Sequence, residues 1–317
     1  GLLWAEEDLE VRVLPASLAP AFGPTDGLLL RLSLDEASGA TAADTAGAAP
    51  ATPGTLATIG TTGPPQWQPG AGRIGGALAF NGDGQRVEVP DSADKPLDGF
   101  AQLTAAAWIR LDSTNSTARA IIAKRGSTST SSISWQLGLN SSQRLTANIG
   151  SSSITGTTTL AADRWYHVAM VFDGTLDDRR LKLFINGLPE LFGTVSATNL
   201  TRAATVPVRV GDYTTAAVSG ASGFLGLLDE VRVYNRALSQ EELLLLASPA
   251  ARTVGPRIAL PQGSVSGAAG QPIALQASVD DAGFGPVALA WTHHSGPGEV
   301  VFSAPFAANT QATADFS

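Results

Sequence analysis

Two adjacent carboxylates, Asp229 and Glu230, stand in an otherwise apolar run within "GLLDEVRVYNRALSQEEL", residues 226–243. Two carboxylates can cleave a glycosidic bond when they lie about 5–5.5 Å apart (retention) or about 6.5–9.5 Å apart (inversion). Successive side chains of a regular strand point to opposite faces, so these neighbours are not expected to form such a pair. An E-x-D-x-x-E pattern, which would align carboxylates on one face, is absent. We therefore interpret both acids as part of the scaffold.

Aromatic side chains are the second kind of candidate, because sugar rings stack on the faces of tryptophan and tyrosine. Trp67 in "GPPQWQPG" and Tyr213 in "GDYTTAAVSG" are the candidate ligand-binding residues. Trp67 can equally be a loop anchor that packs back onto a sheet. Trp108, Trp135 and Trp165 lie in strand-like runs and are predicted to belong to the core.

The composition excludes several functional classes. The 317 residues carry a formal charge of −8, so a basic nucleic-acid footprint and a polybasic membrane patch are both missing. The absence of cysteine excludes thiolate metal sites and cysteine nucleophiles. Among the three histidines, His167 lies opposite the apolar face of its strand and is predicted to be on the surface. No run approaches the ~20 apolar residues of a membrane-spanning helix.

Short alternating runs and turn signals predict the elements that must position these residues. Runs such as "QLTAAAWIRLD", "WYHVAMVFDG" and "VPVRVGD" follow one another at the spacing of an all-β sandwich. The segment "LKLFINGLPE" predicts a hairpin with its turn at Asn186 and Gly187. One short helix is predicted near 239–247, because Ser239 and Glu242 form a capping box before a run of leucines.

Ordered segments of the chain resemble the laminin-G-like jelly-roll domains of bacterial surface and secreted proteins. They include "GGALAFNGDGQRVEVPDS", "LTAAAWIRLD", "DRWYHVAMVFDG", "LKLFINGLPE" and "FLGLLDEVRVYNRALSQEEL". The resemblance covers residues 27–248. It implies the concanavalin A-like lectin/glucanase fold, an all-β jelly-roll sandwich.

The rest of the chain is predicted to consist of partial domains. After a linker at 249–256, residues 257–317 resemble a polycystic-kidney-disease (PKD) type immunoglobulin-like domain, on the segments "GQPIALQASVDD" and "LAWTHHSGPGEVVFS". This β-sandwich is expected to be incomplete at its C-terminus, because the sequence stops before the family's last strands. Residues 1–26 are predicted to be the last strand of a preceding PKD-like domain and a linker.

The resemblance also implies a metal site. In related jelly rolls a calcium ion often joins the first strand region to the last, and the matching carboxylates here are Asp35, Asp44 and Asp229. Calcium takes about six to eight oxygen ligands. The asparagines that relatives often carry after the second of these acids are missing from "DTAGAAPATPG". The alternative is that the acids cap turns or pair with Arg232 or Arg236.

We predict a non-catalytic extracellular module, of bacterial origin from its composition, that serves adhesion or surface and filament architecture. The alternative is a lectin-like carbohydrate-binding module, which could depend on calcium, of a secreted glycan-active protein. The partner would be a glycan or neighbouring copies of the same protein, with neither nucleic acid nor membrane insertion. For the architectural role, one segment could complete a neighbouring sheet by strand addition: Glu10, Val11, Arg12, Val13 and Leu14. An ordinary tandem array of domains would explain that segment without exchange.

Overall fold

A computed structural model of the chain describes residues 23–248, apart from 60, 83, 92, 115–116, 127–132, 204 and 214–222. It also describes residues 257–259, 271–276, 278–280, 299–303 and 309–315. The chain divides into two units, and the larger comprises residues 22–250. The segment predicted to add to a neighbouring sheet, Glu10 to Leu14, lies outside the described residues and stays a prediction.

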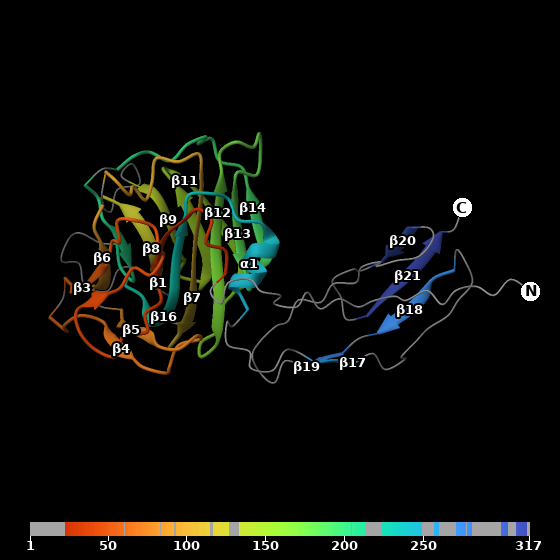
Figure 1. The fold of residues 1–317 in the computed structure, drawn as a ribbon, viewed down its shortest axis with the longest axis horizontal. Helices are drawn as coiled ribbons and strands as arrows, with labels where there is room; N and C mark the ends of the chain where they lie inside the picture. The colour runs from red at the N-terminus through yellow and green to blue at the C-terminus, as the bar shows by residue number, and fades with distance from the viewer. Residues whose placement is uncertain are drawn as a thin grey trace, which may run out of the picture. The chain divides into compact units, whose positions relative to one another are not determined.

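The larger unit is a sandwich of two antiparallel eight-stranded sheets (Figure 1). In the first sheet, β5 pairs with the first half of β16 and β1 pairs with its second half. The order of the first sheet is β14 (Leu188–Gly193), β13 (Leu181–Ile185), β12 (Trp165–Asp173), β7 (Gln102–Leu111), β16 (Leu225–Tyr234), β5 (Ala77–Asn81), β4 (Gln66–Gln68), with β1 (Leu28–Leu32) beside β16. The order of the second is β11 (Ser152–Thr159), β10 (Arg144–Ile149), β9 (Ile133–Leu139), β8 (Arg119–Arg125), β15 (Val208–Val210), β6 (Gln85–Val89), β3 (Gly54–Thr58), β2 (Thr41–Ala42).

The main core lies between the two sheets and is built from every second residue of their strands. Its largest members include Trp135, Phe172 and Phe224, each fully buried. The predicted hairpin turn is confirmed, because Asn186 (φ 53°) and Gly187 (φ 77°) join β13 to β14 with left-handed backbone conformations. The jelly-roll, nearly all-β fold predicted from the sequence is therefore confirmed.

A second, smaller cluster lies on the outer face of the first sheet, beneath helix α1 (Gln240–Leu246). Figure 1 shows α1 beside β13 and β14. The predicted capping box is present, since the Ser239 hydroxyl accepts a bond from the Glu242 amide and the Glu242 carboxylate accepts one from the Ser239 amide. Leu243 and Leu246 are the buried residues of this helix.

The described part of the C-terminal unit contains two small antiparallel sheets. In one, β17 (Arg257–Ala259) pairs with β19 (Ser278–Asp280). In the other, β21 (Asn309–Asp315) lies between β18 (Ile273–Gln276) and β20 (Glu299–Phe302). These strands agree with a β domain, while the PKD-type assignment stays a prediction.

Among the described residues, no helix has the length and apolar character needed to cross a membrane.

Candidate functional site

Glu230 lies at a bulge in β16, where the pairing with β7 shifts register between Asp229 and Arg232. Its left-handed backbone (φ 49°) resets the alternation of faces, so the predicted separation of the two acids onto opposite faces is wrong. The Glu230 carboxylate accepts bonds from Arg31 Nη2 at 2.6 Å and Arg232 Nη2 at 2.7 Å, and the residue is 3% exposed. Burial alone would raise its pKa, but the two arginines more than offset burial and lower that pKa. Glu230 is therefore ionised and links β1 to β16 through its bonds with the two arginines.

Asp229 is fully buried beneath the loop at 72–76, which joins β4 to β5. Its Oδ2 accepts a hydrogen bond from the Ile74 amide at 2.8 Å, while its Oδ1 has no partner among the described residues. Burial, with the charges of Glu230 and Asp35 adding to it, raises the pKa of Asp229 to about 8. An enclosed carboxyl group of this kind has no access to a polysaccharide chain.

The three predicted metal ligands do not converge on one point. Asp35 lies near Asp229, and its Oδ1 accepts a bond from the Gly76 amide at 2.6 Å. Asp44 instead pairs with the Lys95 ammonium at 2.5 Å. In the described part of the chain, no three acidic or histidine side chains form a cluster that could hold a metal ion. The donor set does not fit a calcium ion shared by all three carboxylates.

The predicted alternative for these acids holds in part. Asp44 does organise a turn, because its carboxylate accepts bonds from backbone amides of the following loop. Arg232 and Arg236, the proposed cationic partners, bind other acids, namely Glu230 and Glu242.

Trp67 lies on the edge strand β4 and not in a loop, which corrects the placement inferred from its flanking prolines and glycines. Its ring packs partly buried against the main core, and its Nε1 donates to the Gly39 carbonyl at 2.8 Å. This geometry supports the anchor interpretation. Tyr213 follows β15 and is half-buried, with the guanidinium carbon of Arg125 lying 4.3 Å from the centre of its ring.

His167 is 2% exposed, so the predicted surface location is wrong. It faces outwards from β12, and its ring lies 5.5 Å from that of Trp108, its partner in register on β7. Burial lowers the pKa of His167 to about 3, with the charge of Arg232 adding to the effect. The outer face of the first sheet is thus closed at this polar position.

A row of polar side chains, not expected from the sequence, crosses the outer face of the second sheet. Residues that fill the core alternate here with residues that point outwards. The strand register places the outward residues side by side on β6, β15, β8, β9 and β10. Four of them form the polar row, namely Glu88, Arg209, Gln136 and Asn148, and Ala123 lies between Arg209 and Gln136. Arg209 and Gln136 are buried, whereas Glu88 and Asn148 are half-buried.

Charged and aromatic neighbours fix the geometry of this row. Arg209 Nε donates to Glu88 Oε1 at 2.9 Å, and Arg125 Nη1 donates to Gln136 Oε1 at 2.6 Å. Burial would raise the pKa of Glu88, but its arginine partners lower it below its usual value. The guanidinium group of Arg125 also stacks on the ring of Tyr213. One of the two predicted ligand-binding residues therefore lies next to the polar row. In the sequence, these outward positions are indicated by the polar residue at every second position of "RVEV", "VRV" and "SWQ".

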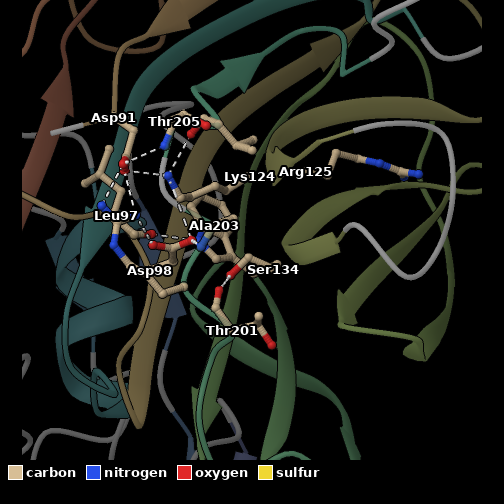
Figure 2. A network of polar contacts seen from close by, with 12 residues as sticks. Asp91, Leu97, Asp98, Lys124, Arg125, Ser134, Thr201, Ala203 and Thr205 are labelled. Atoms are coloured by element: carbon tan, nitrogen blue, oxygen red, sulfur yellow. Dashed lines mark hydrogen bonds and ion pairs between the residues drawn. The ribbon is translucent and has the colours of Figure 1, made fainter. Parts of the chain in front are cut away.

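Figure 2 shows a different polar cluster, in which Lys124 turns towards Asp91 and Asp98. The Lys124 ammonium donates to Asp91 Oδ1 at 2.6 Å and to the Val206 carbonyl at 2.7 Å. Arg202 bridges the same two aspartates at 2.6 and 2.7 Å. Burial lowers the pKa of Lys124, although both aspartates act in the opposite direction. Opposite charges are matched here, which assigns the cluster to the scaffold.

Comparison with known proteins identifies one family model, the concanavalin A-like lectin/glucanases superfamily (Laminin_G_3), which matches residues 81–244. No curated protein sequence matches the chain.

Solved structures share the fold at low identity. Domain 4 of AbnA, a GH43 extracellular arabinanase from Geobacillus stearothermophilus solved with arabinotriose, is 21% identical, with a TM-score of 0.51, and the match covers 70% of this chain and 98% of that one. The sialidase of Trypanosoma rangeli with the inhibitor DANA is 19% identical (TM-score 0.51), and the match covers 75% of this chain but only 35% of the sialidase. The binding domain of Paraclostridial Mosquitocidal Protein 1 is 16% identical (TM-score 0.52), and the match covers 71% of this chain and 52% of that domain's chain.

Proposed function

This chain belongs to the concanavalin A-like lectin/glucanase superfamily, and on that premise we propose that its jelly roll is a non-catalytic glycan-binding module of an extracellular adhesion protein. The observation that carries the proposal is the polar row on the outer face of the second sheet, with Tyr213 beside it. The structural neighbours support the ligand class, since one of them was solved with arabinotriose and another is named a binding domain.

The side chains of the polar row have the chemistry that sugar hydroxyls require. The half-buried Asn148 amide both donates and accepts hydrogen bonds, and the half-buried Glu88 carboxylate accepts them. The buried Arg209 and Gln136 hold Glu88 and Arg125 in position. An aromatic ring beside such groups offers an apolar surface for the C–H face of a sugar. Asn148 is partly exposed, and the neighbouring strand β11 carries further exposed hydroxyls that would extend the surface.

The state of the acidic residues supports a non-catalytic role. A glycosidase pair needs one carboxyl group that can be protonated and one that is ionised, both facing the substrate. Glu230 is held ionised by two arginines, and Asp229 is enclosed. Asp91 and Asp98 share Lys124 and Arg202 and are likewise committed to the scaffold.

The test is a binding screen of the full chain against a glycan panel that includes arabino-oligosaccharides and sialosides. We expect Tyr213→Ala and Asn148→Ala each to weaken binding about tenfold or more, which corresponds to ~1.4 kcal/mol. The matched control is Phe192→Ala, which removes a 40% exposed ring from the other sheet and should leave affinity unchanged.

Two results would contradict this proposal. Loss of binding in Trp67→Ala, with Tyr213→Ala unaffected, would move the site to the edge strand β4. An absence of glycan binding, together with regular filaments in electron micrographs, would favour the architectural role over adhesion to glycans.

A further inference from the structure

The Lys95 ammonium lies in a cage of oxygen atoms formed by the loop at 44–52. It donates to Asp44 Oδ2 at 2.5 Å, to the Ala48 carbonyl at 3.1 Å and to the Pro50 carbonyl at 3.0 Å. A lysine ammonium has three N–H donors, and each has an acceptor here. The side chains of Lys95 and Asp44 are 2% and 1% exposed, so this cation is enclosed within the protein.

The remaining bonds of Asp44 fasten the loop to the first strand. Its Oδ1 accepts bonds from the amides of Arg31 in β1 and Ala46, and its Oδ2 accepts one from the amide of Thr52. Burial would raise the pKa of Asp44, but the bond with Lys95 and those with the backbone lower it. Asp44 is therefore an ionised carboxylate whose charge is balanced by one ammonium group.

Carboxylate, backbone carbonyl and hydroxyl oxygens are also the donors that calcium prefers. The family resemblance implied a calcium ligand at Asp44, and the structure places an amino group of the chain against that same carboxylate. The Thr52 hydroxyl lies 3.4 Å from Asp44 Oδ2 and would provide a further oxygen at the same place.

We propose that Lys95 is a tethered substitute for a metal ion: its ammonium occupies a cation site of the loop at 44–52, and its removal opens a latent divalent-cation site. The donors of that latent site are the Asp44 carboxylate, the Thr52 hydroxyl and the carbonyls of Ala48 and Pro50, with water completing the shell. The loop of the natural protein therefore folds without metal, and this inference is independent of which glycan the module binds.

The experiment compares melting temperatures of the full chain in excess EDTA and in millimolar calcium chloride, with calcium binding measured by titration calorimetry. For wild type we expect the same Tm in both conditions. Lys95→Ala leaves a buried carboxylate without its cation, so its Tm in EDTA should fall by roughly 10 °C. Calcium should restore part of that loss and bind with measurable heat.

Two further variants serve as controls. Lys182→Met removes a lysine from β13, outside the cage, and should change neither the Tm in EDTA nor the calcium response. Asp44→Asn combined with Lys95→Ala removes the carboxylate of the latent site, so calcium should no longer raise the Tm.

The proposal is overturned if calcium raises the Tm of wild type and Asp44→Asn abolishes that increase, because the natural loop would then hold a metal ion. It is also overturned if Lys95→Ala folds but binds no calcium, which would leave an ordinary buried salt bridge. If Lys95→Ala is unfolded in both buffers, Lys95→Ser, whose short side chain leaves the cage open and adds a hydroxyl oxygen, is measured in the same way. A folded Lys95→Ser with no calcium response would equally overturn the proposal.

Discussion

The middle of the outer face of the first sheet is covered by the chain itself, whereas the outer face of the second sheet presents a polar row from β6 to β10. On the first sheet, α1 covers apolar side chains, the loop at 72–76 covers Asp229, and Glu230 and His167 are buried as well. On the second, the polar row contains the buried Arg209 and Gln136 and the half-buried Glu88 and Asn148, and the edge strand β11 is largely exposed. Changes on the first face should therefore cost folding stability, and changes on the second should cost binding.

The largest effect is expected at Glu230, where one carboxylate meets two buried guanidinium groups. Glu230→Gln should lower the free energy of unfolding by about 3–5 kcal/mol, because it leaves buried arginines without a counter-charge. Urea unfolding monitored by tryptophan fluorescence measures this loss. Asp178→Asn is the control, since that carboxylate is 74% exposed and surface pairs contribute about 1 kcal/mol or less. A loss below ~1 kcal/mol at Glu230 would contradict the closed-face description.

The next effect concerns the helix that covers the first sheet. Leu243 is fully buried, and Leu243→Ala should lower the free energy of unfolding by about 2–5 kcal/mol through lost burial and the cavity left behind. Leu245→Ala makes the same substitution two residues later, where the side chain is 38% exposed, and should change stability by only ~0.5 kcal/mol. Equal losses in the two variants would mean that α1 does not cover the face through Leu243.

The pH dependence of stability tests the same closed face at His167. The folded-state pKa of about 3 lies below the ordinary 6.5, so the unfolded state binds more protons between these values. Stability should fall as the pH drops from 6.5 towards 3, by up to about 1.4 kcal/mol for each pH unit. The charged group acting on this imidazole is Arg232, whose positive charge lowers the same pKa.

His167→Gln isolates this contribution, because all carboxylates and the other two histidines titrate in both proteins. The comparison is the slope of unfolding free energy against pH from 6.5 to 5 in wild type and in the variant. The unfolding free energy should depend less steeply on pH in the variant than in wild type. Identical slopes would show that His167 is accessible to protons in the folded state.

Features that depend on a few neighbouring residues could be predicted from the sequence. The capping box of Ser239 and Glu242 and the turn at Asn186 and Gly187 were both found where local chemistry placed them. Resemblance to a family gave the jelly roll as a whole. The bulge at Glu230 could not be predicted, because the carboxylate of this left-handed residue binds Arg31, a residue distant in the sequence.

The polar row and the buried histidine were missed for a related reason. Alternation shows that Glu88, Arg209 and Gln136 point away from the core, but only the strand register places them in one row, with Ala123 between the last two. For His167, alternation gave the face correctly, and what it could not give was that other parts of the chain cover that face. The cage around Lys95 likewise depends on a loop that lies more than forty residues earlier in the chain.

The smallest stability effect is expected on the second sheet, and it completes the comparison between the faces. Asn148→Ala should change the free energy of unfolding by no more than about 0.5 kcal/mol, because its side chain is partly exposed. Thr104→Ala on the first face should cost about 1–3 kcal/mol, since the buried hydroxyl donates to the Arg236 carbonyl at 2.8 Å and accepts from the Leu238 amide at 3.0 Å. If Asn148→Ala proves as costly as Thr104→Ala, the polar row is part of the scaffold and not a surface available to a ligand. If it leaves stability intact while weakening glycan binding, the division of roles between the two faces holds at the level of single side chains.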